Sequence, residues 1–247
     1  HEEDSTLSRH GCINEGKAAA RLGLRGIPNA AEDIMVSRDI ELARLTGARL
    51  HLQHISTRGS VALLSEARKN GLRVTGEVTP HHLALCEDDI PGYDANYKMN
   101  PPLRTKEDRA ALIKGLQKGI IDVIATDHAP HQSVEKDIEF DKAPFGTIGL
   151  ETALGVALTT LYHAGVMPLS DIVRAMSCRP QEILGLTDFA AVKEGCEANL
   201  TVVDIDKEWT VAKESFSSRS SNSCFLGARL KGKPVATICK GLYHTWE

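Results

Sequence analysis

Residues 124–131 (IATDHAPH) follow a short run of β-branched residues and bring an aspartate and two histidines together. A buried parallel strand that ends in such residues places a carboxylate and imidazoles at its carboxyl end, where (β/α) barrels keep their chemistry. Burying Asp127 there is costly unless the carboxylate is paired, protonated or bound to a cation. The plain alternative is a cap for a following helix, which the nearby Pro130 disfavours. Asp127 is therefore a candidate metal ligand or general base.

A second imidazole, His54, closes a strand-like segment at residues 49–55. Because side chains alternate along a strand, His54 and His51 point to opposite faces, and only one of them can face a barrel mouth. The alternative is a structural, hydrogen-bonded histidine. The following residues, Ser56 and Thr57, resemble a helix start, which indicates a strand-to-helix corner at His54.

Other polar residues are weaker candidates, because each has an ordinary alternative. His131 can contact an anionic ligand or be a surface histidine. Asn100, in a proline-constrained loop, can bind substrate or form an Asx turn. His81 and His82 follow a strand end: one can support a ligand and the other lie on a helix surface, and neither is predicted to be a metal ligand. The Pro/Gly loop at residues 143–146 can offer backbone N–H groups to a ligand or be a plain turn.

Helix-like and strand-like patterns alternate through the first part of the chain, which predicts a parallel sheet covered by helices. The predicted helices are residues 14–22, 30–46, 60–70 and 105–118, and the predicted strands are 49–55, 72–78 and 120–126. Two further helices, at 150–163 and 169–176, have no strand between them.

Beyond about residue 190 the composition is typical of β structure. The predicted strands there are residues 198–204, 209–212 and 234–239, and the serine-rich residues 215–223 are predicted to be a solvated loop. We expect a first domain over residues 1–190 and a small β subdomain over residues 191–247.

Bulk composition narrows the function classes. The 247 residues carry a formal charge of −4 with no long block of one sign, which argues against a nucleic-acid or polybasic membrane partner. The six cysteines are scattered without a CxxC pair, which favours reduced thiols in a cytosolic protein. Neither a membrane-spanning run nor a signal peptide is predicted. The missing initiator Met, and only three or four barrel-type strands where a barrel takes about 250 residues, indicate that the front half of a longer protein is absent.

Several motifs together resemble those of dihydroorotases, members of the amidohydrolase superfamily, and specifically their longer bacterial class. The similarity covers nearly the whole chain. It runs through residues 52–57 (LQHIST), 77–83 (EVTPHHL), 98–104 (KMNPPLR), 125–131 (ATDHAPH), 143–146 (APFG) and 149–152 (GLET).

The resemblance implies an α/β fold, the C-terminal portion of a metal-dependent (β/α)8 TIM-like barrel, with a small β subdomain built from both chain ends and a tail packed on the barrel. It implies a zinc centre of one or two ions, with His1 and His54 as histidine ligands. Asp127 matches the aspartate that binds metal and shuttles the proton.

Substrate contacts are implied as well. Asn100 and His131 match substrate-contacting positions, and the amide of Gly146 lies in a loop that contacts the pyrimidine ring. The family's first-strand His-x-His pair, its substrate-carboxylate arginine and asparagine, and the carboxylate or modified lysine that bridges the metals have no match here. We expect them to precede residue 1, so the chain supplies only part of the metal site.

The implied activity is the reversible interconversion of N-carbamoyl-L-aspartate and (S)-dihydroorotate in de novo pyrimidine biosynthesis, with the N-terminal half needed for turnover. A related hydantoinase or allantoinase is one alternative. An inactive fragment, or a scaffold subunit of a pyrimidine-pathway complex, is another. We expect a cytoplasmic homo-oligomer without nucleic-acid or membrane partners, and with aspartate transcarbamoylase as a candidate partner. Exposed strand edges of a half barrel would require covering.

Overall fold

A computed structural model describes residues 1–186 and 192–245, and it divides into two compact units. Unit 1 consists of His1–Glu151 and Phe216–Cys224, and unit 2 of Thr152–Ser215 and Phe225–Glu247. These units divide the chain at a different point from the expected boundary at residue 190. The residues around that boundary, 187–191, lie outside the described part of the chain, so the boundary remains a proposal for the domains of the whole protein.

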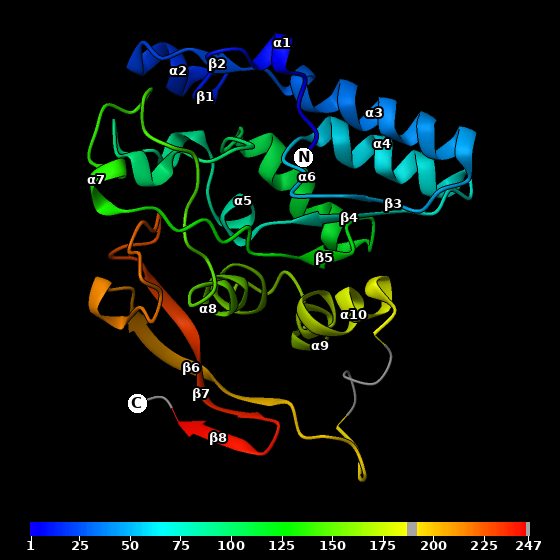
Figure 1. The fold of residues 1–247 in the computed structure, drawn as a ribbon, viewed down its shortest axis with the longest axis vertical. Helices are drawn as coiled ribbons and strands as arrows, with labels where there is room; N and C mark the ends of the chain where they lie inside the picture. The colour runs from blue at the N-terminus through cyan, green and yellow to red at the C-terminus, as the bar shows by residue number, and fades with distance from the viewer. Residues whose placement is uncertain (187–191, 246–247) are drawn as a thin grey trace. The chain divides into compact units, whose positions relative to one another are not determined.

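Unit 1 is built on a parallel sheet of three strands in the order β3-β4-β5, with a two-stranded parallel sheet, β1-β2, beside the first helices (Figure 1). The strands are β1 (Ile13–Asn14), β2 (Gly26–Ile27), β3 (Leu50–Leu52), β4 (Val74–Val78) and β5 (Val123–Ile124). The helices are α1 (Ser5–Ser8), α2 (Lys17–Leu22), α3 (Asn29–Thr46), α4 (Arg58–Lys69), α5 (Pro80–Ala84), α6 (Lys106–Gln117) and α7 (Ser133–Lys136). Short 3-10 turns lie at Glu87–Asp89 and Ala95–Tyr97.

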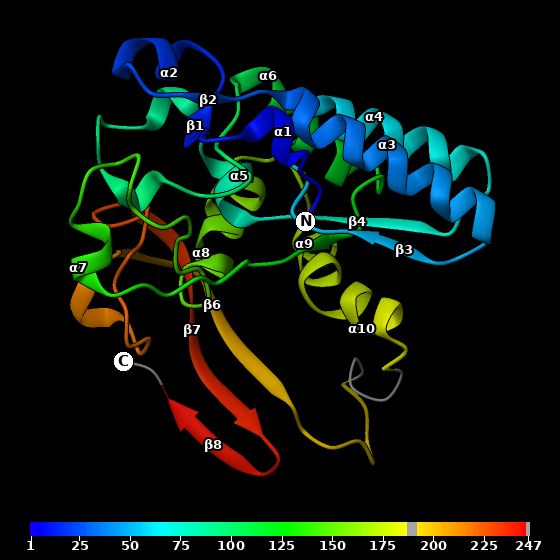
Figure 2. The same cartoon turned by 45° about the horizontal axis from the view of Figure 1, so that its top comes forward.

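Alternation along β4 explains how the sheet is covered. Val74, Gly76 and Val78 are buried, while the residues between them are half-buried. A Cβ on Gly76 would lie 2.7 Å from Leu64 on α4, so this face of the strand meets the helix directly. Figures 1 and 2 both show α3 and α4 running along one face of the sheet. The opposite face carries the polar side chains of His51, Thr75 and Glu77.

The predicted elements of unit 1 exist, and mainly their ends differ. Helix α3 matches the expected residues 30–46 within one residue, because Gly47 in the left-handed conformation stops it. The strands are shorter than expected: β5 is only Val123–Ile124, within the predicted residues 120–126. The ladder stops early because the chain turns away at the polar residues that follow β3 and β5.

Unit 2 combines helices with an antiparallel sheet in the order β6-β7-β8. Its strands are β6 (Leu200–Thr210), β7 (Arg229–Cys239) and β8 (Leu242–Thr245), with a 3-10 turn at Lys213–Ser215. Its helices are α8 (Ala153–Ala157), α9 (Leu169–Val173) and α10 (Arg179–Leu184), with π-helical turns at Leu158–Tyr162 and Arg174–Cys178. Gly232 has φ of 97°, and a Cβ there would overlap the Leu158 side chain, so glycine allows β7 to approach the π-helical turn closely.

Two sequence expectations in unit 2 were wrong. The helix expected to end at Met176 continues to Leu184 despite Pro180. The Arg179 N–H bonds to the Arg174 carbonyl five residues back, and this wider π turn accommodates the proline, which lacks an N–H. The strands expected at 198–204 and 209–212 form one strand, β6, with register irregularities between Asp204 and Glu208. Most polar residues of β6 lie at exposed positions. Because residues 205–208 are largely polar, the sequence pattern suggested a break between two strands.

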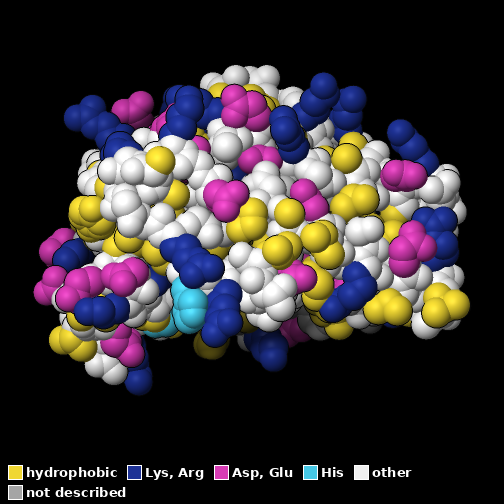
Figure 3. Space-filling view, turned by 90° about the horizontal axis from the view of Figure 1, so that it is seen from above, with side chains coloured by type: hydrophobic (Ala, Val, Ile, Leu, Met, Phe, Trp, Pro, Cys, Tyr) yellow, Lys and Arg dark blue, Asp and Glu magenta, His cyan; other side chains and the backbone are white. Residues whose placement is uncertain are grey.

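The surface carries both signs of charge. On the face shown in Figure 3, Lys and Arg side chains are interspersed with Asp and Glu. In the described part of the chain, no helix is both long and apolar enough to cross a bilayer. The six cysteines are unpaired, and Cys12, Cys86 and Cys224 are buried.

Candidate active site

Two candidate residues follow the carboxyl ends of parallel strands in an unusual backbone conformation. His54 comes after β3 with φ of 33°, and Asp127 comes after β5 with φ of 47°. Non-glycine residues in the left-handed region are uncommon and cluster at functional sites. Because the strands are parallel, both residues lie at the carboxyl-terminal end of the sheet.

The structure brings His1 and His54 together. Their rings lie edge to face with centroids 4.7 Å apart. His54 is buried, whereas His1 is exposed. The backbone N–H of His54 donates to Oε1 of Glu77 on β4 at 3.3 Å. Two imidazoles from distant parts of the sequence therefore meet at the end of β3.

Glu77 also fixes His51, on the face of the sheet that α4 does not cover. Nε2 of His51 lies 3.0 Å from Glu77 Oε2, and Nδ1 lies 2.8 Å from the Thr75 hydroxyl. The register pairs His51 directly with Thr75. His51 therefore points away from the helix-covered face and supports the segment that carries His54.

A buried charge network lies behind the same corner. Glu32 on α3 accepts hydrogen bonds from the backbone N–H groups of Ser56 and Thr57 at 2.9 and 3.2 Å, and from the Ser60 hydroxyl at 2.7 Å. Arg104 lies 3.9 Å from Glu32 and donates to the Ser56 hydroxyl at 3.1 Å. The backbone just after His54 is thus held by a carboxylate from one helix and a guanidinium from the loop before α6.

The residue pair His81 and His82 is buried at the start of α5. Burial, with the nearby His54 adding to it, lowers the pKa of His82 to about 3, and burial lowers that of His81 well below its usual range. Nε2 of His82 lies 3.0 Å from the Pro101 carbonyl, and Nδ1 lies 2.7 Å from the Thr79 hydroxyl. A neutral His82 therefore donates to Pro101 and anchors the loop that carries Asn100.

These buried histidines predict an acid-sensitive fold. An unfolded histidine titrates near pH 6.5, so between about pH 3 and 6.5 the unfolded chain binds more protons than the folded one. Stability therefore falls as pH falls, by at most about 1.4 kcal/mol per pH unit for each histidine. We expect His82→Gln to flatten the dependence of the unfolding free energy on pH between 4 and 6.5, measured by urea titration. An unaltered slope in His82→Gln would contradict this account.

His131 and Gly146 form a second cluster. Nε2 of His131 lies 2.8 Å from the Phe145 carbonyl, and Nδ1 lies 3.9 Å from Glu135. Gly146 is buried with φ of 128°. Its N–H donates to the Lys98 carbonyl at 2.9 Å, so this amide already has a protein partner.

The Gly146 position excludes any side chain. A Cβ there would lie 2.5 Å from the Ala129 side chain and 3.1 Å from His131 Nε2, in a backbone region nearly reserved for glycine. We expect Gly146→Ala to lower the free energy of unfolding by about 1–3 kcal/mol, measured by urea unfolding. Gly119→Ala is the matched control, because Gly119 has φ of 64° but nothing within 4 Å of its Cβ position. Equal losses in both variants would show that crowding at Gly146 is unimportant.

The loop that holds Asn100 contacts residues near both clusters. Nδ2 of Asn100 donates to the Glu3 carboxylate, close to His1 in sequence. Two residues earlier, Lys98 donates from Nζ to the carbonyls of Asp141 and Ala143 at 3.0 and 2.6 Å, and it lies 4.6 Å from the centre of the Phe145 ring. The loop that holds Asn100 is thereby tied to the loop that holds Gly146.

The residues fit part of a metal site. Paired imidazoles are good zinc ligands. Within residues 1–186 and 192–245, however, no group of three or more His, Cys, Asp or Glu side chains is close enough to hold an ion. Asp127 is exposed and does not join the His1–His54 pair in such a group. We therefore assign no reaction step to metal geometry.

A family model described as "Amidohydrolase family" matches residues 10–242 of the chain. The chain belongs to the amidohydrolase family. Among curated relatives, this amidohydrolase is 50% identical to a dihydroorotase of Carboxydothermus hydrogenoformans over 98% of the chain and 56% of that protein. It is 48% identical to a dihydroorotase of Endomicrobium trichonymphae over 98% of the chain and 57% of that protein. The chain therefore spans little more than half the length of these relatives.

Solved structures of similar fold include hydantoinases. An L-hydantoinase from Arthrobacter aurescens matches with a TM-score of 0.86 at 28% identity, over 98% of this chain and 55% of that one. A dihydropyrimidinase from Brevibacillus agri matches with a TM-score of 0.88 at 24% identity, over 98% of this chain and 55% of that one. Family membership and the likeness to these structures imply a TIM-barrel-like α/β fold, and the described residues contain the mixed helices and parallel strands of such a fold.

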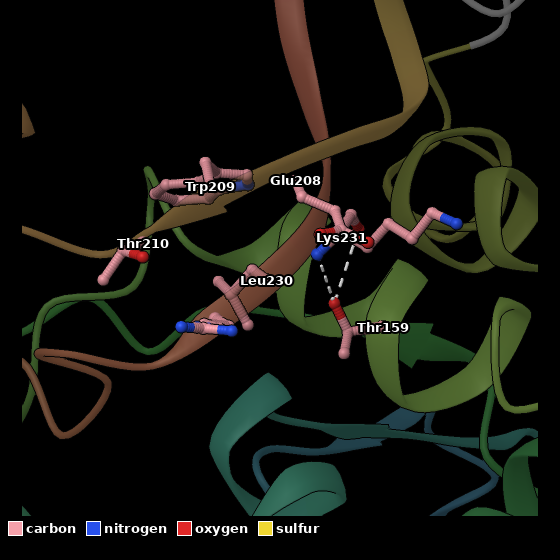
Figure 4. Close-up of a pocket in the computed structure, with 7 residues that line it drawn as sticks. Thr159, Glu208, Trp209, Thr210, Leu230 and Lys231 are labelled. Carbon is pink, nitrogen blue, oxygen red and sulfur yellow. Dashed lines mark hydrogen bonds between the residues drawn. The ribbon is translucent and has the colours of Figure 1, made fainter.

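The amidohydrolase has a separate hollow in unit 2, with a volume of about 380 Å³ (Figure 4). It is lined by Thr159, Glu208, Trp209, Thr210, Arg229, Leu230 and Lys231. The backbone N–H of Lys231 donates to the Thr159 hydroxyl at 2.8 Å, one of the hydrogen bonds drawn in Figure 4. None of the candidate site residues lines this hollow.

Sequence reasoning missed the residues that support the candidate side chains. They are Glu32, His51, Glu77, Lys98, Arg104 and Asn222. For the pair His81 and His82, the sequence left open a supporting role for one of them, and His82 has that role through its contact with the Pro101 carbonyl. Only Glu77 had a local signal, because it falls on an alternate position of a predicted strand that otherwise carries buried apolar residues. The tertiary partners of the others are 19 or more positions away in the sequence.

Proposed function

We propose that this chain is the C-terminal part of a zinc-dependent dihydroorotase, which interconverts N-carbamoyl-L-aspartate and (S)-dihydroorotate in pyrimidine biosynthesis. The observation that carries the proposal is the approach of the His1 and His54 rings at the carboxyl end of β3. The choice of substrate is supported by relatives named dihydroorotase at 45–50% identity, against 28% for the L-hydantoinase structure.

The reaction adds the elements of water across the ring C–N bond: a hydroxyl goes to the carbonyl carbon and a proton to the nitrogen. Asp127 accepts the proton from water at its carboxylate and returns it to the leaving nitrogen. Asn100 and His131 bind the substrate's polar groups. Gly146 allows its loop to approach the ring closely, since no side chain intervenes.

Zinc, one or two ions, would be held by His1, His54 and Asp127 together with further donors. When bound, it supplies a water of lowered pKa and polarises the carbonyl. We place these residues at the mouth of an eight-stranded barrel, of which β3, β4 and β5 are part. Residues 1–190 belong to that barrel in this proposal, and residues 191–247 to a small β subdomain.

The proposal extends to the protein's setting. The unpaired, scattered cysteines support a cytoplasmic location. A homo-oligomer, with aspartate transcarbamoylase as a candidate partner, would cover the edges of the sheet. Sedimentation of the purified protein, alone and with that enzyme, tests both associations.

The activity is tested with the complete protein, assayed on dihydroorotate, hydantoin and allantoin while bound zinc is quantified. We expect dihydroorotate to be preferred by at least about 100-fold in kcat/KM, because ring-contacting residues discriminate among these amides. Preference for hydantoin or allantoin would instead identify a related amidase. Zinc-loaded protein without turnover on any of them would favour a scaffold.

A further inference from the structure

The serine-rich segment near the end of unit 1 contains a buried asparagine with every hydrogen-bonding site used. Asn222 is 5% exposed. Its Oδ1 accepts from the His131 N–H at 3.0 Å, and its Nδ2 donates to the carbonyls of Ala129 and Gly146 at 3.0 and 3.2 Å. The Ser220 hydroxyl also contacts Oδ1. An amide has two donors and two acceptor sites, so none is left over.

These contacts join the two segments that carry His131 and Gly146. Apart from this side chain, the segments are linked by the isolated bridge between His128 and Thr147, the Ala129 N–H to Thr147 carbonyl bond at 3.0 Å, and the His131 ring contact with Phe145. The backbone of Asn222 contributes as well, because its carbonyl accepts from the Ile148 N–H at 2.9 Å. We call the contacts of Asn222 with residues 129–131 and 146–148 the clamp. Asn222, 76 to 93 positions away in sequence, therefore adds side-chain hydrogen bonds to both segments and reinforces their spacing.

We propose that Asn222 is a positioning residue for substrate binding, which holds His131 and Gly146 in the register that a cyclic amide requires. The inference rests on the proposed function, because it takes His131 and Gly146 as substrate contacts. Asn222 does not touch the substrate. It acts by fixing the backbone at residue 131 and the carbonyl of residue 146.

Aspartate at this position tests the chemistry of the clamp. It keeps the size and one oxygen of asparagine but places a second oxygen against two carbonyl oxygens, in a buried site. In the complete protein, we expect Asn222→Asp to raise KM for dihydroorotate by at least about tenfold, with a smaller change in kcat, because the lost contribution is to binding. Asn199→Asp is the matched control, since Asn199 accepts from the Lys240 N–H and contacts neither His131 nor Gly146 in the described part of the chain, and both constants should stay unchanged.

A double-mutant cycle separates positioning from a general loss of stability. If Asn222 acts through His131, the effect of Asn222→Asp on KM should shrink to within about twofold when His131→Asn is already present. Full additivity would overturn the proposal. If Asn222→Asp does not fold, Ser220→Ala removes one partner of Oδ1 and should raise KM in the same direction, with the same loss of effect beside His131→Asn.

Hydrogen exchange provides a readout that does not depend on the reaction. Amides in residues 129–131 and 146–148 should exchange faster in Asn222→Asp, while those of α3 and α4 keep their protection. Unchanged exchange in these segments would contradict the clamp itself. Faster exchange in a protein that turns over no dihydroorotate would instead leave the clamp standing and overturn the proposed function.

Discussion

Asp127→Asn is expected to reduce dihydroorotate turnover by about 10²- to 10⁴-fold, the usual contribution of a positioned general acid–base group. The amide keeps the shape of the side chain but can neither take up the proton from water nor return it to the ring nitrogen. The carboxylate is exposed at the end of β5, with a left-handed backbone that aims the chain away from the ladder. The measurement is kcat of the complete protein at saturating substrate, with zinc content determined on the same sample.

Zinc content distinguishes the two roles proposed for Asp127. Low turnover with zinc retained supports proton transfer, whereas turnover restored by added zinc supports a ligand role alone. Asp137→Asn, an exposed aspartate at the end of α7, is the matched control and should change nothing. Near-normal turnover of Asp127→Asn with zinc bound would remove Asp127 from the mechanism.

Glu32→Ala is expected to lower the free energy of unfolding by about 3–5 kcal/mol, the cost of removing one member of a buried ion pair. The variant leaves Arg104 buried without its carboxylate partner. It also leaves the N–H groups of Ser56 and Thr57 without an acceptor. Urea unfolding of the protein measures the loss as a lower midpoint at unchanged slope.

The control for Glu32 lies on the same helix. The Glu41 side chain is 64% exposed and, among the described residues, forms an ion pair with Arg44 alone, so Glu41→Ala should cost no more than about 0.5 kcal/mol. Because Ser56 and Thr57 follow His54 closely, Glu32→Ala should also lower activity at temperatures where the protein is still folded. A loss similar to that of Glu41→Ala would show that the network contributes little.

Local patterns were sufficient to predict the longer helices and the three-stranded sheet of unit 1, but not its short elements α1, α5, α7, β1 and β2. Helix α3 and the strands β3, β4 and β5 appear where periodicity and helix-stop glycines indicated them, since these signals depend on neighbours in sequence. The same patterns predicted that His54 and Asp127 follow strand ends. They missed the length of the helix through Pro180, because the π turn that accommodates the proline is not visible in an apolar period.

Contacts among distant residues could not be predicted in this way. The serine-rich residues 215–223 were expected to be a solvated loop, but Asn222 and Ser223 are buried in unit 1. A short polar segment has the same composition whether water or protein carbonyls satisfy its hydrogen bonds. Likewise, the Asp127 carboxylate is exposed, although its position after a buried strand suggested burial.

The sequence by itself determined which residue types end each strand of the sheet, and so which chemistry the chain can offer. Only the tertiary structure decided that His1 meets His54, that Glu32 and Arg104 hold the backbone behind them, and that Asn222 joins His131 to Gly146. The physical reason is the sequence distance over which each kind of interaction acts. Strand and helix patterns arise from neighbours a few residues apart, whereas buried polar groups select partners by position in the folded chain.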